Sequence, residues 1–230
     1  MATAPSDVRA ALEDVTAAGE AEAAYLIEQG ADMDDLLEAA PVIVASHQDA
    51  AALLAAEWYE ESRDDVSPPR AYSPEPVTYL LVPKIGDSVG WAFRSSNAGA
   101  KELSLDANAQ QALLLERLLP AVGKWIATGF WDTTTENVRR DKSAVGWQRF
   151  TRSGGCRFCR MLADRGAVYK KETASFAAHV HCRCIARAAF QGGEYGPEAS
   201  AMQYIASQKR RSAEQKKRLR EYLVENYPAA

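Results

Sequence analysis

The sequence has few of the features that mark membrane-spanning, secreted or disulfide-stabilised proteins. No apolar run reaches the roughly 20 residues that span a bilayer. The first residues lack the basic and then apolar order of a signal peptide. Only 4 of the 230 residues are cysteine and only 3 are histidine. We therefore expect a cytoplasmic protein without a membrane partner, in which clustered thiols bind a metal more readily than they form disulfides.

Basic residues are scarce in the first part of the chain and concentrated later. Residues 1–138 contain 8 Lys or Arg and 23 Asp or Glu, whereas residues 139–187 contain 12 and 3. The net charge of −4 thus hides an acidic front and a basic back. This polarity indicates either two surfaces with different partners or two halves that neutralise each other across an interface, and the sequence favours neither.

Hydrophobic periodicity predicts a mainly α protein. Apolar residues recur at helical spacing within residues 1–65 and again after Asp106, a candidate N-cap. Pro41 is expected to begin a helix, and Pro120 is expected to kink or split one. A further helix is expected over residues 133–142. Four prolines within residues 66–76 predict a linker there.

The pattern changes after Lys142 and predicts three domains. An acidic helical domain covers residues 1–142. A small α+β module stapled by zinc covers residues 143–192, with alternating bulky and polar residues that predict a strand at its start. A basic C-terminal helix covers residues 193–230, with its helical pattern over 198–226.

All four cysteines fall within one stretch of 29 residues, together with two of the three histidines. A Cys-x-x-Cys pair begins the stretch, and a His/Cys cluster follows it after nineteen residues. This spacing predicts a structural zinc site, because Zn²⁺ takes four thiolate or imidazole ligands in a tetrahedron. Four ligands are expected among five residues: Cys156, Cys159, His179, Cys182 and Cys184. The sequence does not choose between Cys182 and Cys184, and His181 is a less favoured candidate.

Other interpretations of the cysteines are a set of reduced core thiols and a redox Cys-x-x-Cys pair. A catalytic metal would need an open ligand position and a nearby base. Between Cys156 and Cys184 the only acidic residues are Asp164 and Glu172. Neither belongs to a His-Glu-x-x-His helix or to a deaminase signature. The sequence therefore favours a closed structural site in a protein that is not an enzyme.

The dense basic residues around the cysteines, and those of the C-terminal helix, are typical of contact with phosphate backbone. A solvated face or an acidic protein partner would explain them equally. No motif for reading bases is present, so binding to DNA would be non-specific. The residues expected to contact DNA or a protein partner are Arg139, Arg140, Arg149, Arg152, Arg157, Arg160, Lys209, Arg210, Arg211, Lys216, Lys217 and Arg218.

The residues around the cysteines resemble a known family. Three segments carry the resemblance: 141–149 with Gly146 and Trp147, 155–169 with the Cys-x-x-Cys pair, and 176–184 with its His-x-x-Cys-x-Cys pattern. They look like the C-terminal signature of MuF-like minor capsid proteins, the head morphogenesis proteins of tailed bacteriophages, here of the actinobacteriophage type. The preceding helices are similar more loosely.

The resemblance implies a virion protein in few copies inside the head, associated with the portal, capsid proteins and packaged double-stranded DNA. It also implies a role in assembly or genome delivery, and it carries the five cysteine and histidine positions over as zinc ligands. The alternative is a small zinc-containing endonuclease of the His-Asn-His type. In that alternative His179 and His181 would be catalytic and would not bind the zinc ion. No suitably spaced Asn/His partner follows them.

Overall fold

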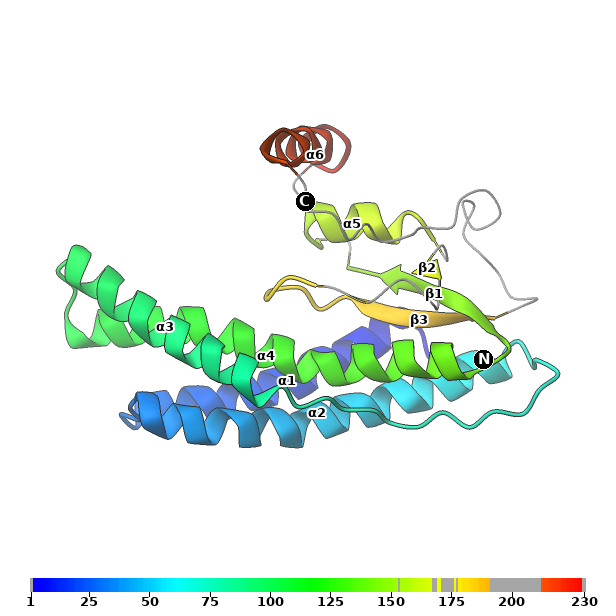
Figure 1. The fold of residues 1–230 in the computed structure, drawn as a ribbon, viewed down its shortest axis with the longest axis horizontal. Helices are drawn as coiled ribbons and strands as arrows, with labels where there is room; N and C mark the ends of the chain where they lie inside the picture. Colours follow the sequence, from blue (N-terminus) through cyan, green and yellow to red (C-terminus); the bar gives the residue numbers. More distant parts are fainter. Residues whose placement is uncertain are drawn as a thin grey trace.

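The computed structural model describes residues 2–152, 154–166, 169–170, 176, 178–190 and 212–228. Within these residues the protein is mainly α-helical, which confirms the predicted fold class. Four long helices form the base of the molecule, and a small antiparallel sheet lies against them (Figure 1). Two further helices lie on the other side of the sheet (Figure 1).

Two of the four long helices begin at an aspartate that caps them. The four helices are α1 (Pro5–Glu28), α2 (Met33–Asp64), α3 (Val82–Glu102) and α4 (Ala107–Arg140). Asp32 caps α2 by accepting hydrogen bonds from the backbone N–H groups of Asp34 and Asp35. Asp106 caps α4 by accepting from the Ala109 N–H at 2.8 Å, as its sequence position predicted.

Pro41, which was expected to begin a helix, and Pro120, which was expected to kink or split one, both lie inside continuous helices. α4 continues without a break to Arg140, so the segment predicted as a separate helix over 133–142 is mostly the last part of α4. The helix start at Pro41 and the split at Pro120 were wrong predictions. A proline inside a helix removes one hydrogen bond. Burial of the apolar side chains on both sides of each proline outweighs that loss.

The main core fills the space between the long helices. Leu12, Leu36, Val44 and Ile126 belong to it and are completely buried. Helices α2 and α4 approach each other closely at Gly129, where an added Cβ would lie 2.3 Å from the Gln48 carbonyl oxygen. The sequence needs a glycine there because any side chain would push the two helices apart.

Among the described residues, α2 is the one helix whose length and apolar composition would allow it to cross a membrane. Core helices of soluble proteins pass the same test. In this structure the apolar side of α2, including Ile43, Ala51 and Trp58, is buried in the main core.

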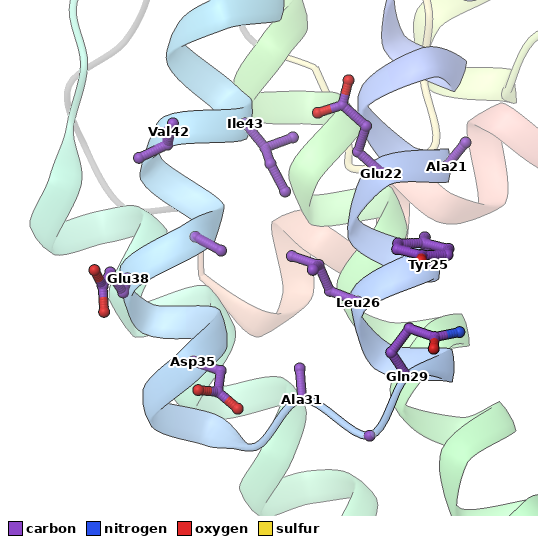
Figure 2. A pocket seen from close by; sticks show the side chains of 12 residues that line it. Ala21, Glu22, Tyr25, Leu26, Gln29, Ala31, Asp35, Glu38, Val42 and Ile43 are labelled. Atoms are coloured by element: carbon purple, nitrogen blue, oxygen red, sulfur yellow. The ribbon is translucent and has the colours of Figure 1, made fainter.

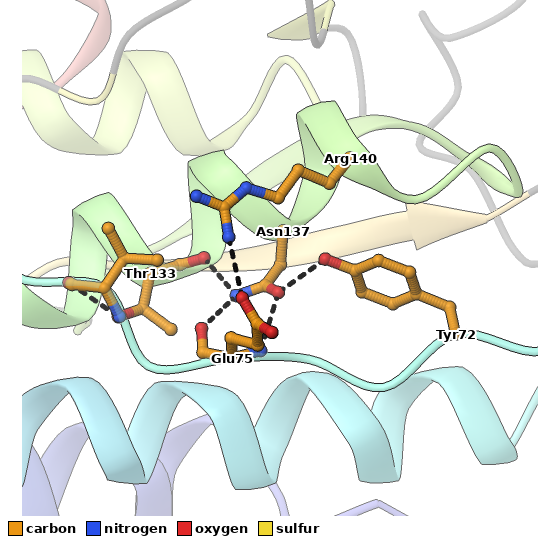
Figure 3. Close-up of polar contacts among 6 residues, drawn as sticks. Tyr72, Glu75, Thr133, Asn137 and Arg140 are labelled. Atoms are coloured by element: carbon orange, nitrogen blue, oxygen red, sulfur yellow. Dashed lines mark hydrogen bonds and ion pairs between the residues drawn. The ribbon is translucent and has the colours of Figure 1, made fainter.

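The predicted linker is held against α4 by hydrogen bonds to one buried residue (Figure 3). The Asn137 side-chain oxygen accepts from Tyr72 Oη at 2.7 Å and from the Glu75 N–H at 2.9 Å. Its amide nitrogen donates to the carbonyl oxygens of Glu75 and Thr133 at 2.8 and 2.7 Å. Arg140 adds an exposed ion pair with Glu75. All four hydrogen-bonding positions of the amide are thus used, so the linker follows a fixed course.

The sheet contains β1 (Ala144–Phe150), β2 (Tyr169–Lys170) and β3 (Ile185–Phe190), in the order β2-β1-β3 with antiparallel pairing. Helices α2 and α4 contact it on one side. Helix α5 (Arg157–Ala163) contacts β1, and α6 (Ala213–Asn226) contacts α5. Trp147 and Tyr169 stack at 4.1 Å between ring centroids within the second hydrophobic cluster.

The sheet and the helices share their buried residues. Ile185 of β3 belongs to the main helical core, while Tyr59 of α2 and Val138 of α4 belong to the second cluster with Trp147. The expected boundary near residue 142 coincides with the passage from α4 to β1, and the division into three domains stays a prediction. Residues 193–211 of the predicted C-terminal helix lie outside the described residues.

Candidate metal centre

Strand pairing brings the two halves of the cysteine motif together. Phe150 at the end of β1 pairs with Ile185 at the start of β3. The segment that follows β1 therefore runs beside the segment that precedes β3. Cys156 follows β1 as the N-cap of α5, and its Sγ accepts from the Cys159 N–H at 3.4 Å. On the other side, the Cys182 N–H donates to the His179 carbonyl oxygen at 3.0 Å and closes a turn.

Four potential ligand atoms lie within 4.8 Å of one another: those of Cys156, Cys159, His179 and Cys182. Cys182 Sγ is 3.5 Å from the Sγ atoms of both Cys156 and Cys159. His179 Nδ1 is 3.7 Å from the Sγ atoms of Cys156 and Cys182. Zn–S bonds of about 2.3 Å and Zn–N bonds of about 2.0 Å give tetrahedral edges of about 3.8 Å and about 3.6 Å. The cluster therefore has the size and donor set that suit a zinc ion.

The cluster is closed on its inner side. Cys159 and Cys182 are buried, and Phe176 and Ala178 pack against the sulfur atoms. His179 is exposed, and its ring lies 5.6 Å from that of Phe158 on α5. Cys156 is also exposed. Four protein ligands would fill the tetrahedron, as in structural zinc sites, and would leave no position for a reactive water molecule.

Cys184 lies beside this group and outside it. Its Sγ donates to Thr151 Oγ1 at 3.4 Å, and its carbonyl oxygen accepts from Trp131 Nε1 at 2.8 Å. The sequence left Cys182 and Cys184 as equal candidates, and the structure places Cys182 among the four clustered ligand atoms. His181, the less favoured ligand, is exposed and lines a cleft of about 200 Å³ together with Arg152.

Close packing makes ionisation of the buried Cys159 thiol difficult in the absence of a cation. The pKa of Cys159 is raised by its hydrogen bonds with Cys182 and Cys184 and by its burial. A divalent cation reverses this effect, because a coordinated thiol loses its proton. A bound metal ion would therefore allow Cys159 to ionise where its bare thiolate is disfavoured.

Arg149 lies next to the cluster, although it was predicted to face DNA or a protein partner. Its side chain is only 2% exposed. The guanidinium carbon lies 3.9 Å from the Phe176 ring centroid, and NH1 points toward Cys159 Sγ at 4.0 Å. Sequence alone missed this placement, because the position of Arg149 in β1 is exposed or buried according to which face of the sheet is covered.

The other predicted basic residues fall into three groups. Arg157 and Arg160 of α5 donate to the carbonyl oxygens of Tyr227 and Pro228, and so hold the C-terminal end against α5. Lys209, Arg210 and Arg211 lie outside the described residues. The remaining six are exposed on α4, after β1 and on α6: Arg139, Arg140, Arg152, Lys216, Lys217 and Arg218.

Several basic side chains of the second half pair with acidic residues of the first half. Arg183 next to the cluster contacts Glu20 of α1, and Arg187 of β3 lies 3.8 Å from Asp65 after α2. The pKa of Glu20 is nevertheless raised, because the cost of its burial exceeds the attraction of Arg183. These pairs show that part of the charge polarity is neutralised inside the molecule, which was one of the two interpretations left open.

Comparison with known proteins identifies the class of the chain. A family model described as VG15 protein matches residues 2–208. The chain therefore belongs to the VG15 protein family, a family of phage virion genes. It is thus a phage protein associated with the virion. No curated protein matches the chain, and no solved structure matches it.

Proposed function

We propose that this chain is a non-enzymatic minor capsid protein that is present in few copies inside the phage head. Its family membership supports a virion role, and the MuF-like pattern around the cysteines supports the minor capsid assignment. The observation that carries the proposal is the closed Cys₃His cluster between α5 and the start of β3. A full tetrahedron of protein ligands serves to hold a fold together and offers no site for hydrolysis.

In this proposal zinc is the cofactor, and its chemistry is that of a structural cross-link. Cys156 and Cys159 hold the start of α5, whereas His179 and Cys182 hold the turn before β3. Their joint coordination fixes α5 over the sheet. α5 in turn carries Arg157 and Arg160, which hold the C-terminal end of the chain. The metal centre thus fixes the place from which the basic C-terminal helix projects.

The location is tested by mass spectrometry of purified virions, with copy number measured against the portal and the major capsid protein. We expect the chain in mature particles, at a copy number close to that of the portal and far below that of the major capsid protein. Absence from purified particles would refute a minor capsid role and favour a cytoplasmic adaptor that acts only during assembly.

We further propose that packaged duplex DNA contacts the exposed face of α6, with portal and capsid proteins as the other partners. Lys216, Lys217 and Arg220 are exposed there and would bind phosphate groups without selecting a base sequence. Changing all three to Gln is expected to weaken binding to a DNA duplex and to reduce its dependence on salt. The matched control changes the exposed Lys84 and Lys101 on α3, and no effect is expected from it. Affinity that does not fall as salt is raised would refute phosphate contact.

The endonuclease alternative makes a different demand on the same residues. It needs a histidine for chemistry, yet His179 lies within the metal cluster. His181 is the remaining candidate, in the cleft beside Arg152 and Glu13. Incubation of supercoiled plasmid with the protein and Mg²⁺ or Mn²⁺ distinguishes the two functions. We expect no nicking, and nicking that disappears in His181→Ala would overturn the non-enzymatic proposal.

A further inference from the structure

The hairpin formed by α1 and α2 carries a groove that lies apart from the metal centre. The groove has a volume of about 950 Å³ and is bounded by the last two turns of α1, the turn at Gly30 and the first three turns of α2. Figure 2 shows Leu26 and Ile43 facing each other across its floor, with Tyr25 on the α1 side and Val42 on the α2 side.

Two large apolar side chains of this groove are exposed to solvent. Tyr25 is 61% exposed and Val42 is 68% exposed. Between them lie Leu26 and Ile43, together with the smaller Ala31 and Ala39. These side chains form an apolar channel between two helices, which is the kind of surface that accepts the apolar stripe of a third helix.

All charged residues that line the groove are acidic: Glu22, Asp35 and Glu38. The helices around it are acidic as well, because residues 5–64 contain 15 Asp or Glu and 2 Lys or Arg. Glu22 has His47 as a partner at 2.9 Å, and Asp35 accepts from the Asp32 N–H. Glu38 is exposed at the edge of the groove, where it can meet a basic side chain of a partner.

We propose that this groove, defined by Leu26, Ala39, Val42, Ile43 and the rim residues Tyr25 and Glu38, binds a basic amphipathic helix of a partner protein. The apolar stripe of that helix would fill the channel, and lysine or arginine residues flanking the stripe would face the acidic rims. Affinity comes from burial of the exposed apolar surface, and orientation comes from the charges.

The acidic charge of the hairpin also disfavours two other possible occupants of the groove. A second copy of the hairpin would bring two acidic rims together, and like charges at an interface cost several kcal/mol. An anionic lipid surface would be repelled for the same reason. A basic helix is the occupant whose charge and shape both match the groove.

The probes are two fluorescent model helices of equal length, one of leucine and lysine and one of leucine and glutamate. Their binding to the full-length, metal-loaded protein is measured by anisotropy. We expect the Leu–Lys helix to bind and the Leu–Glu helix to bind at least tenfold more weakly. Val42→Ala should weaken binding of the Leu–Lys helix about tenfold, because two methyl groups lose their burial. Glu38→Lys should weaken binding of the Leu–Lys helix and strengthen binding of the Leu–Glu helix.

The matched controls lie on the same helix α2 outside the groove. Leu53→Ala removes another exposed apolar side chain, and Glu57→Lys reverses another exposed charge. Both should leave binding of the Leu–Lys helix unchanged. Equal binding of the two helices, absence of binding, or equal effects of Val42→Ala and Leu53→Ala would overturn the proposal. Concentration-dependent dimerisation that Val42→Ala abolishes would also overturn it and would identify a second copy as the occupant.

Discussion

Removal of Cys182 and of Cys184 should have opposite consequences for the metal, although the two residues are separated by a single position in the chain. The Cys182 Sγ lies 3.5 Å from two other cysteine sulfurs, a distance close to the edge of a zinc tetrahedron. Cys184 Sγ is outside the group of four clustered ligand atoms and donates to Thr151. We therefore expect Cys182→Ala to lose bound zinc and Cys184→Ala to retain one zinc ion per chain.

The magnitude follows from linkage between metal binding and folding. A ligand present at 1,000 times its dissociation constant stabilises the folded state by about 4 kcal/mol. In a chain of this size each kcal/mol shifts Tm by roughly 2–4 °C. Cys182→Ala should therefore lower Tm by about 8–16 °C. Cys184→Ala loses weak sulfur hydrogen bonds and a small buried group, about 1–2 kcal/mol, and should lower Tm by only about 2–8 °C.

The assay combines elemental analysis of the purified variants with thermal unfolding before and after addition of a chelator. Wild type and Cys184→Ala should contain equimolar zinc and should lose stability on chelation. Cys182→Ala should be insensitive to the chelator because it has no zinc to lose. The reasoning is refuted if Cys184→Ala loses the metal while Cys182→Ala keeps it, or if wild type contains none.

Three further changes test the fold that supports the centre. Asn137→Ala removes four hydrogen bonds of a fully buried amide, so it should cost about 2–4 kcal/mol and expose the linker over residues 66–76 to proteases. The control Arg140→Ala removes only an exposed ion pair and should cost less than about 1 kcal/mol in denaturant titrations. Gly129→Ala should destabilise the protein by more than about 2 kcal/mol, because its Cβ would meet the Gln48 carbonyl oxygen; wild-type Tm in this variant would contradict the close helix approach. Burial, followed by Glu136, raises the pKa of Asp132 to about 6. The folded state therefore holds this proton more tightly than the unfolded state, and stability falls as pH rises from about 4 to about 6. Asp132→Asn should be stabilised by about 1–2 kcal/mol at pH 7.5, after allowance for its partial exposure, and by much less at pH 4; an equal gain at both pH values would show that the charge is not the cause.

Some of the architecture could be predicted because it depends on local patterns. Apolar periodicity predicted the helical class, and Asp106 was identified as an N-cap from its position before the periodic run. The spacing of the cysteines predicted a metal site because Cys-x-x-Cys geometry is set by a few adjacent backbone angles. Pro41 and Pro120 misled the prediction, because a local rule cannot include the packing of flanking residues against distant helices.

The sequence did not predict which residues the charged side chains contact. Arg149, Arg157 and Arg183 look alike in a count of basic residues. In the structure the first is buried against Phe176, the second holds Tyr227, and the third contacts Glu20. The role of each arginine depends on the residue that it contacts in the folded chain. These contact residues are between 27 and 163 positions away in the sequence.

The sequence by itself determined the donor chemistry of the metal centre, the mainly helical class and the acidic and basic halves. Only the tertiary structure separated Cys182 from Cys184 and brought Cys156 and Cys159 to His179. The physical reason is that ligand type and helical periodicity are properties of neighbouring residues. A tetrahedron of ligands requires four atoms within a few ångströms, and the antiparallel pairing of β1 with β3 is what brings them there.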